Sequence, residues 1–137
     1  MHRFVWDLRE APPRALQHDL PISAVPHGTP RTPEGPLVVP GRYTVALDAD
    51  GRRLERPLTV VMDPRVTISP AALVEQYRLA MRLVAIMDRS AAAGRRELND
   101  QAAALLDIID GADAPPTSQA AEAVRSLEGQ ESRIPKR

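Results

Sequence analysis

The chain contains no cysteine, and its charges carry no excess of either sign. Without cysteine the protein has no disulfide, no thiolate zinc site and no thiol nucleophile. Eighteen basic residues balance eighteen acidic ones, and no cluster of arginine or lysine is interleaved with aromatic residues. We therefore expect neither a nucleic-acid partner nor an anionic-membrane partner.

Aromatic residues and long apolar runs are also scarce. The four aromatics, Phe4, Trp6, Tyr43 and Tyr77, all lie on apolar stripes, so none is expected to be free for a sugar ligand. No apolar run reaches the roughly 18 residues of a transmembrane helix, and the first residues lack the basic-then-apolar pattern of a signal peptide. The sequence leaves the cellular compartment open. Its 137 residues predict one domain with a thin core, or a small sheet domain with a helical appendage.

The strongest pattern runs from Pro36 to Val66, where two stretches alternate apolar and polar residues. The apolar positions that share one face are Tyr43, Val45, Leu47, Leu54, Leu58, Val60 and Met62. Asp50-Gly51 lies between the stretches and suits a turn with positive φ angles. The pattern predicts a β-hairpin whose residues Tyr43, Val45, Leu58 and Val60 are largely buried beneath further strands or a helix. On this prediction Val45→Asp costs several kcal/mol.

Two segments precede the hairpin. Phe4, Trp6 and Leu8 alternate with polar or smaller residues, which predicts a strand at 4–8. Eight of the fourteen prolines then fall between Glu10 and Pro40, which predicts a long loop with at most a short edge strand at 22–25. Because the loop also carries apolar residues, we expect it to lie against a neighbouring surface rather than to be a free linker.

A long amphipathic helix is predicted to begin at Ser69-Pro70, because serine is a favoured cap and proline fits the first helical position. Its stripe consists of Leu73, Tyr77, Ala80, Val84 and Met87. This stripe suits the hairpin, the next helix or an external partner, and internal packing is the favoured interpretation. Gly94 predicts the end of the helix or a bend.

The remaining residues predict further helices. A second stripe consists of Leu98, Ala102, Leu105 and Ile109, and Gly111 ends it. Thr117 or Ser118 then caps a third, weaker helix with Ala121, Val124 and Leu127 inward. The chain therefore reads as α+β, with three or four strands, a proline-rich loop and two or three helices.

No residue set defines a catalytic or metal site. His2, His18 and His27 lack metal-ligand spacing. The Asp48-Ala49-Asp50-Gly51 stretch is similar to the start of a calcium loop, but the other ligands are missing, and a hairpin turn explains it better. Trp6-Asp7 could suggest a sugar-stacking platform, but packing of Trp6 in the core is the better interpretation. Neither G-x-S-x-G nor a glycine-rich phosphate loop occurs, so we expect no catalytic residue, cofactor or metal.

Separated blocks of the sequence, in the expected order, resemble the C-terminal region of bacterial BNR-repeat proteins of the sortilin-like β-propeller type. The blocks are HRFVWDLR, PISAVPHGTPRTPEGPLVVPGRYTVAL, LERPLTVVMDPRV and DGADAPPTSQAAEAV. In that family a large propeller precedes an immunoglobulin-like β module with a helical extension. Such proteins are often labelled glycosyl hydrolases or sialidase-like. That chemistry would belong to the propeller, and this chain has no Asp-box of the S-x-D-x-G-x-T-W kind.

The resemblance implies a small immunoglobulin-like antiparallel β module over 1–66, including the proline-rich loop 10–40. A helical extension over 67–128 and a frayed tail over 129–137 follow. The implied function is that of a non-catalytic accessory or interaction module, a truncated C-terminal fragment of such a protein. Its partner would be the β-propeller domain of a parent or homologous protein, and self-association is a further expectation. The alternative is a stand-alone carbohydrate- or peptide-binding module.

Overall fold

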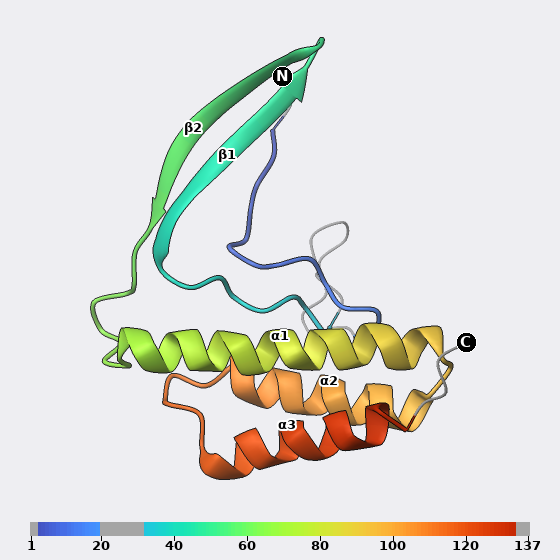
Figure 1. Cartoon of the computed structure of the whole chain (residues 1–137). Coiled ribbons are helices and arrows are strands. Elements are labelled where there is room, and N and C mark those ends of the chain that lie inside the picture. The colour runs from blue at the N-terminus through green and yellow to red at the C-terminus, as the bar shows by residue number, and fades with distance from the viewer. Residues whose placement is uncertain (1–2, 20–31, 134–137) are drawn as a thin grey trace.

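The computed structural model describes residues 3–19 and 32–133 and has an α+β architecture (Figure 1). Its elements are β1 (Gly41–Ala49), β2 (Arg52–Val60), α1 (Pro70–Ala92), α2 (Arg96–Asp110) and α3 (Ser118–Glu131). The three helices pack side by side, and the hairpin of β1 and β2 stands away from them. Residues 3–19 and 32–40 run between the hairpin and the helices (Figure 1).

The predicted hairpin is confirmed. β1 and β2 pair antiparallel, with Tyr43 opposite Leu58 and Leu47 opposite Leu54. Asp50 and Gly51 form the turn with φ angles of 50° and 72°. Two successive residues with positive φ give the turn a twist that matches the twist of the flanking strands, which fixes the register.

The predicted strand at 4–8 does not form. Leu8 has a φ of 65°, a left-handed conformation that interrupts an extended chain. The Asp7 carboxylate accepts a hydrogen bond from the Arg9 backbone N–H at 3.1 Å, which closes a local turn of the kind that aspartate favours. Residues 4–8 form no β-bridge with any described residue, and the nearest bridge joins Arg9 to Leu37.

The sheet has two strands in the part of the chain that the structure describes. This arrangement does not confirm an immunoglobulin-like sandwich. The edge strand expected at 22–25 lies outside the described residues.

Local signals placed the helix ends correctly. The Ser69 side chain accepts a hydrogen bond from the Ala72 N–H, Pro70 opens α1, and Gly94 follows its end with a φ of 66°. The Thr117 hydroxyl likewise accepts from the Ala120 N–H and caps α3. α3 then continues through Glu131, so the first residues of the expected frayed tail are helical.

The core lies between the three helices. Its buried members from α1 are Leu79, Ala80, Leu83, Ile86 and Met87. They meet Leu98, Ala102, Leu106 and Ile109 of α2, and Val124 and Leu127 of α3. The predicted stripe of α1 is thus shifted, because Leu73, Tyr77 and Val84 are only half-buried. No described helix is long and apolar enough to cross a membrane.

The predicted burial of the hairpin is wrong. Val45 is 52% exposed, and Tyr43, Leu58 and Val60 are half-buried. No described helix packs against either strand, so nothing in the helical layer covers the apolar face. The alternation predicted the two faces of the hairpin correctly but not what would lie over them.

Candidate interaction surface

The hairpin of β1 and β2, which we call the arm, has one apolar face and one polar face. Cross-strand neighbours on the apolar face, which we call the arm face, are Gly41–Val60, Tyr43–Leu58, Val45–Arg56, Leu47–Leu54 and Ala49–Arg52. On the polar face, Arg53 pairs with Asp48 at 3.1 Å and with Glu55 at 2.8 Å. The polar face therefore satisfies several of its charges internally, whereas the arm face presents mainly hydrocarbon.

The N-terminal segment, residues 3–19, covers the base of the arm face, where β1 begins and β2 ends. The rings of Trp6 and Tyr43 meet edge to face, with centroids 5.7 Å apart, a favoured aromatic geometry. The Trp6 Nε1–H donates to the Arg9 carbonyl at 2.9 Å, and the Tyr43 hydroxyl donates to the Val39 carbonyl at 2.6 Å. The Trp6 N–H and the Tyr43 hydroxyl both have hydrogen-bond partners, so the two rings are held in place at the base of the arm.

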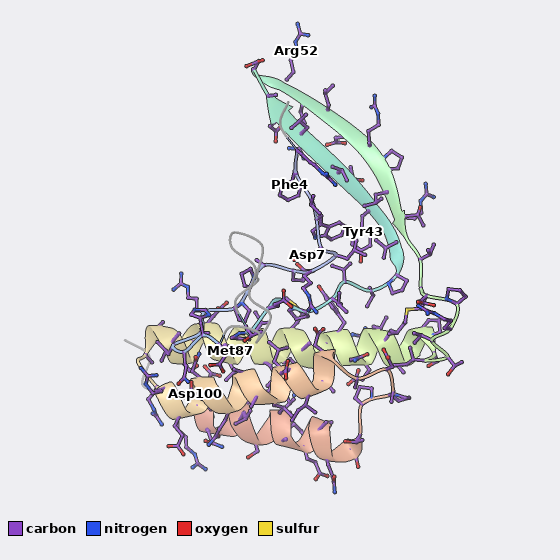
Figure 2. The ribbon with its side chains drawn as sticks, turned by 180° about the vertical axis from the view of Figure 1, so that it is seen from behind. Phe4, Asp7, Tyr43, Arg52, Met87 and Asp100 are labelled. Carbon is purple, nitrogen blue, oxygen red and sulfur yellow. The ribbon has the colours of Figure 1, made fainter. Side chains whose placement is uncertain are left out.

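The outer half of the arm face is uncovered. Leu47 and Leu54 are 58% and 56% exposed, similar to Val45. Phe4 lies alongside the arm between the levels of Tyr43 and Arg52 (Figure 2) and is 89% exposed. The expectation that every aromatic packs into an apolar stripe is therefore wrong for Phe4. Phe4, Val45, Leu47 and Leu54 form the exposed apolar surface of the arm.

An ionic cluster at the base of the arm connects the arm to the helices. Arg9 Nη1 lies 2.6 Å from Asp110 Oδ2 at the end of α2 and donates to the Gly35 carbonyl at 2.7 Å. Arg9 Nε lies 3.4 Å from Glu34 Oε2. The other Asp110 oxygen accepts from the Leu37 N–H at 3.0 Å. One half-buried carboxylate thus ties together α2, the N-terminal segment and the residues that lead into β1.

The N-terminal segment is held along the helices by further polar contacts. The Arg14 N–H donates to Asp88 of α1 at 2.8 Å. The Tyr77 hydroxyl donates to the Glu10 carboxylate at 2.7 Å, and this hydrogen bond raises the pKa of Tyr77 to about 12. These contacts fix the direction in which residues 3–9 leave the helical layer toward the arm.

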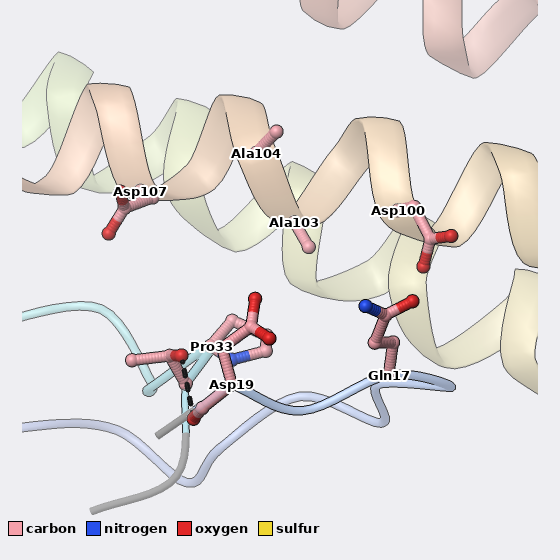
Figure 3. Close-up of a pocket in the computed structure, with 8 residues that line it drawn as sticks. Gln17, Asp19, Pro33, Asp100, Ala103, Ala104 and Asp107 are labelled. Carbon is pink, nitrogen blue, oxygen red and sulfur yellow. Dashed lines mark hydrogen bonds between the residues drawn. The ribbon is translucent and has the colours of Figure 1, made fainter. Parts of the chain in front are cut away.

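A second candidate is a cleft of about 450 Å³ between α2 and the N-terminal segment. Asp100, Ala103, Ala104 and Asp107 of α2 face Gln17, Asp19, Thr32 and Pro33 (Figure 3). The three aspartates make the cleft acidic. Within the described residues, however, no group of histidine or acidic side chains is arranged to hold a metal ion. An acidic lining without such an arrangement defines no ligand chemistry.

The residues singled out in the sequence do not come together as a site. His18 is exposed, and its Nδ1 lies 3.3 Å from the Thr32 carbonyl, while His2 and His27 lie outside the described residues. Asp48 pairs with Arg53, and Asp50 forms the hairpin turn. Trp6 packs on Tyr43 and Asp7 closes the turn at Leu8, so the pair serves local structure.

No sequence pattern indicates the contacts that position the arm. Arg9 and Asp110 are 101 positions apart, and each looks like an ordinary surface charge in its own segment. The alternation of Phe4, Trp6 and Leu8 predicted a strand with Phe4 on its apolar face, but the backbone turns at Leu8 and Phe4 is exposed. Only the alternation of apolar and polar residues along β1 and β2 indicated this surface.

Comparison of the chain with models of protein families, with curated proteins and with solved structures gave no match.

Proposed function

We propose that the chain is a non-catalytic interaction module that uses the exposed part of the arm face to dock on another protein domain. The observation that carries this proposal is the uncovered row of Val45, Leu47 and Leu54 on a hairpin that no described helix supports. A two-stranded hairpin is marginal in water. Exposed apolar patches commonly mark protein interaction sites, and a partner over this one would exclude water from all three side chains.

The first candidate partner is a β-propeller domain of a sortilin-like BNR-repeat protein. The sequence resemblance supports this choice. The architecture is compatible with it, because the helices form their own core and leave the arm free to reach a neighbour. Each large side chain that such a contact fully buries would contribute on the order of 1.5–3 kcal/mol before the costs of association.

The test is a calorimetric titration of the whole chain with a separately purified sortilin-like propeller. We expect saturable binding and slower amide exchange in β1 and β2. The triple variant Val45→Thr/Leu47→Thr/Leu54→Thr keeps strand-forming residues but removes the apolar surface. It should weaken binding more than about tenfold, a loss of about 1.4 kcal/mol.

The matched control is Thr44→Ser. Thr44 lies on the opposite face of the same strand and is exposed, so binding should be unchanged. If the propeller binds the triple variant as tightly as the original chain, the arm face is not the docking surface. If the propeller does not bind the original chain, this partner is wrong.

A second candidate is the carbohydrate-binding alternative, which the 89% exposure of Phe4 favours. Sugar-binding surfaces present aromatic rings to solvent, and this ring is available. A glycan array probed with the chain and with Phe4→Ala tests it. A defined glycan that binds the original chain and not the variant would support this alternative over a purely protein partner.

A further inference from the structure

The arm face carries two arginines and no carboxylate. Arg52 and Arg56 lie on β2 on either side of Leu54, opposite Ala49 and Val45. No cross-strand neighbour on this face is acidic. Neither arginine forms an ion pair with any of the described residues, and the Arg56 guanidinium donates only to the backbone carbonyl of Glu55.

The polar face of the same hairpin differs in this respect. Its Arg53 contacts both Asp48 and Glu55. On the polar face two carboxylates thus offset the charge of Arg53, whereas the apolar face has no carboxylate beside Arg52 and Arg56. A partner that covered the arm face would desolvate the guanidinium groups of Arg52 and Arg56. Desolvated charges are costly unless the partner supplies groups of opposite sign.

A second copy of the chain fits this face less well. If two arm faces packed together about a twofold axis, the contact would contain four arginines and no carboxylate from either face. Like charges brought together in a contact cost several kcal/mol. An anionic membrane is also disfavoured, because Asp48 and Asp50 offset the charges of Arg52 and Arg53 at the tip, which would meet the lipid headgroups first and has no excess of positive charge.

We propose that the partner of the arm is a protein surface that combines apolar side chains with aspartate or glutamate. The carboxylates would pair with Arg52 and Arg56 while apolar groups cover Val45, Leu47 and Leu54. This inference rests on the proposed docking function and adds the chemistry of the partner. Arginine favours such pairing because its planar guanidinium can contact a carboxylate through two hydrogen bonds.

The experiment uses three synthetic peptides with one alternating apolar framework. Their polar positions are all glutamate, all glutamine or all lysine. Fluorescence anisotropy with the whole chain should give at least about tenfold tighter binding for the glutamate peptide than for the lysine peptide. Salt of about 1 M should reduce this preference, because the Debye length is then about 3 Å.

Charge reversal provides the sharpest comparison. Arg52→Glu/Arg56→Glu should invert the order, so that the lysine peptide binds best. The control Arg42→Glu/Arg95→Glu changes the net charge equally but lies away from the arm face, and it should preserve the order. Circular dichroism of both variants checks that the hairpin and helices remain.

Other outcomes would overturn the inference in distinguishable ways. If the three peptides bind equally and the apolar triple variant abolishes binding, docking on the arm stands but the charge preference fails. If none of the peptides binds, the proposed acidic and apolar protein partner is wrong, and the propeller titration decides the docking function separately. Concentration-dependent dimers that the triple variant abolishes would assign the face to a second copy. Binding to phosphatidylserine vesicles through Arg52 and Arg56 would assign it to lipid.

Discussion

Asn99 and Leu16 are 83 positions apart, yet the Leu16 backbone N–H donates to Asn99 Oδ1 at 2.8 Å. The Asn99 amide nitrogen in turn donates to the carbonyls of Arg14 and Met87 and to the Ser90 hydroxyl. The side chain is 1% exposed. It therefore connects the N-terminal segment to both long helices through a buried side chain whose oxygen and nitrogen both have hydrogen-bond partners.

We expect Asn99→Ala to lower the free energy of unfolding by about 2–4 kcal/mol, because it leaves buried polar groups without partners. Urea denaturation measures this loss, and faster exchange of the Leu16 amide would locate it. Gln101→Ala, on an exposed position of the same helix, is the control and should change stability by less than about 0.5 kcal/mol. Equal losses for the two variants would contradict a specific role for Asn99.

α1 and α3 are joined by a two-point ion pair, which makes their contact pH-sensitive. Arg82 Nε and Nη2 each lie 2.7 Å from a Glu128 oxygen. The Arg82 guanidinium holds the pKa of Glu128 below its ordinary value of 4.5. Both side chains are more than a third exposed, so solvent screening limits the pair to about 0.5–1 kcal/mol.

Glu128→Gln should therefore lower stability at about pH 7 by this amount. Because the folded-state pKa of Glu128 is depressed, the contribution is fully present above pH 4.5 and is lost as the pH falls through the folded-state pKa. The variant and the original chain should converge in acid. Thermal melts across this range measure the difference, with Glu122→Gln as the control, because Glu122 lies 3.9 Å from Arg125 and is exposed. A pH-independent difference would contradict the ion-pair explanation.

Tyr77 and Glu10 provide a spectroscopic test of how the N-terminal segment sits on α1. The hydrogen bond to the Glu10 carboxylate raises the pKa of Tyr77 to about 12 from an ordinary value of 10.0. The contact therefore stabilises the fold fully below pH 10.0, and this contribution is lost as the pH rises through about 12. In a Tyr43→Phe background, near-ultraviolet absorbance reports Tyr77 alone. Glu10→Gln should lower the pKa of Tyr77, and an unchanged titration would mean that the segment is not held there.

Sequence reasoning succeeded where a structure is decided by neighbouring residues. Asp50-Gly51 accepts the positive φ angles of a tight turn, and Ser69 and Thr117 supply the oxygens that cap their own helices. The turn and each helix cap depend on only a few adjacent residues. The same reasoning failed at Leu8, because the alternation around it continues in the sequence while the backbone turns.

The candidate surface was only half predictable for a related reason. Parity along β1 and β2 determines which side chains share a face, and this can be read from the chain. Whether that face is covered depends on where the helices lie, which Arg9–Asp110 and Leu16–Asn99 set across 101 and 83 positions. No local pattern records such contacts, so burial of Val45 was expected where exposure is found.

Val45 and Leu83 distinguish the uncovered arm face from the helical core. Val45→Asp should change the free energy of unfolding by less than about 1 kcal/mol, because Val45 is 52% exposed and lies directly opposite Arg56 on the same face. Leu83→Ala, by contrast, removes a side chain with 0% exposure from the centre of the helical core and should cost about 2–5 kcal/mol. Urea denaturation of both variants gives the comparison. Val45→Asp should nevertheless lose binding to the propeller and to the glutamate peptide, since it places a carboxylate in the middle of the docking surface. A Val45→Asp protein that unfolds as readily as Leu83→Ala would show that the arm face is covered within the chain itself. A stable Val45→Asp protein that still binds would remove the arm from the interaction.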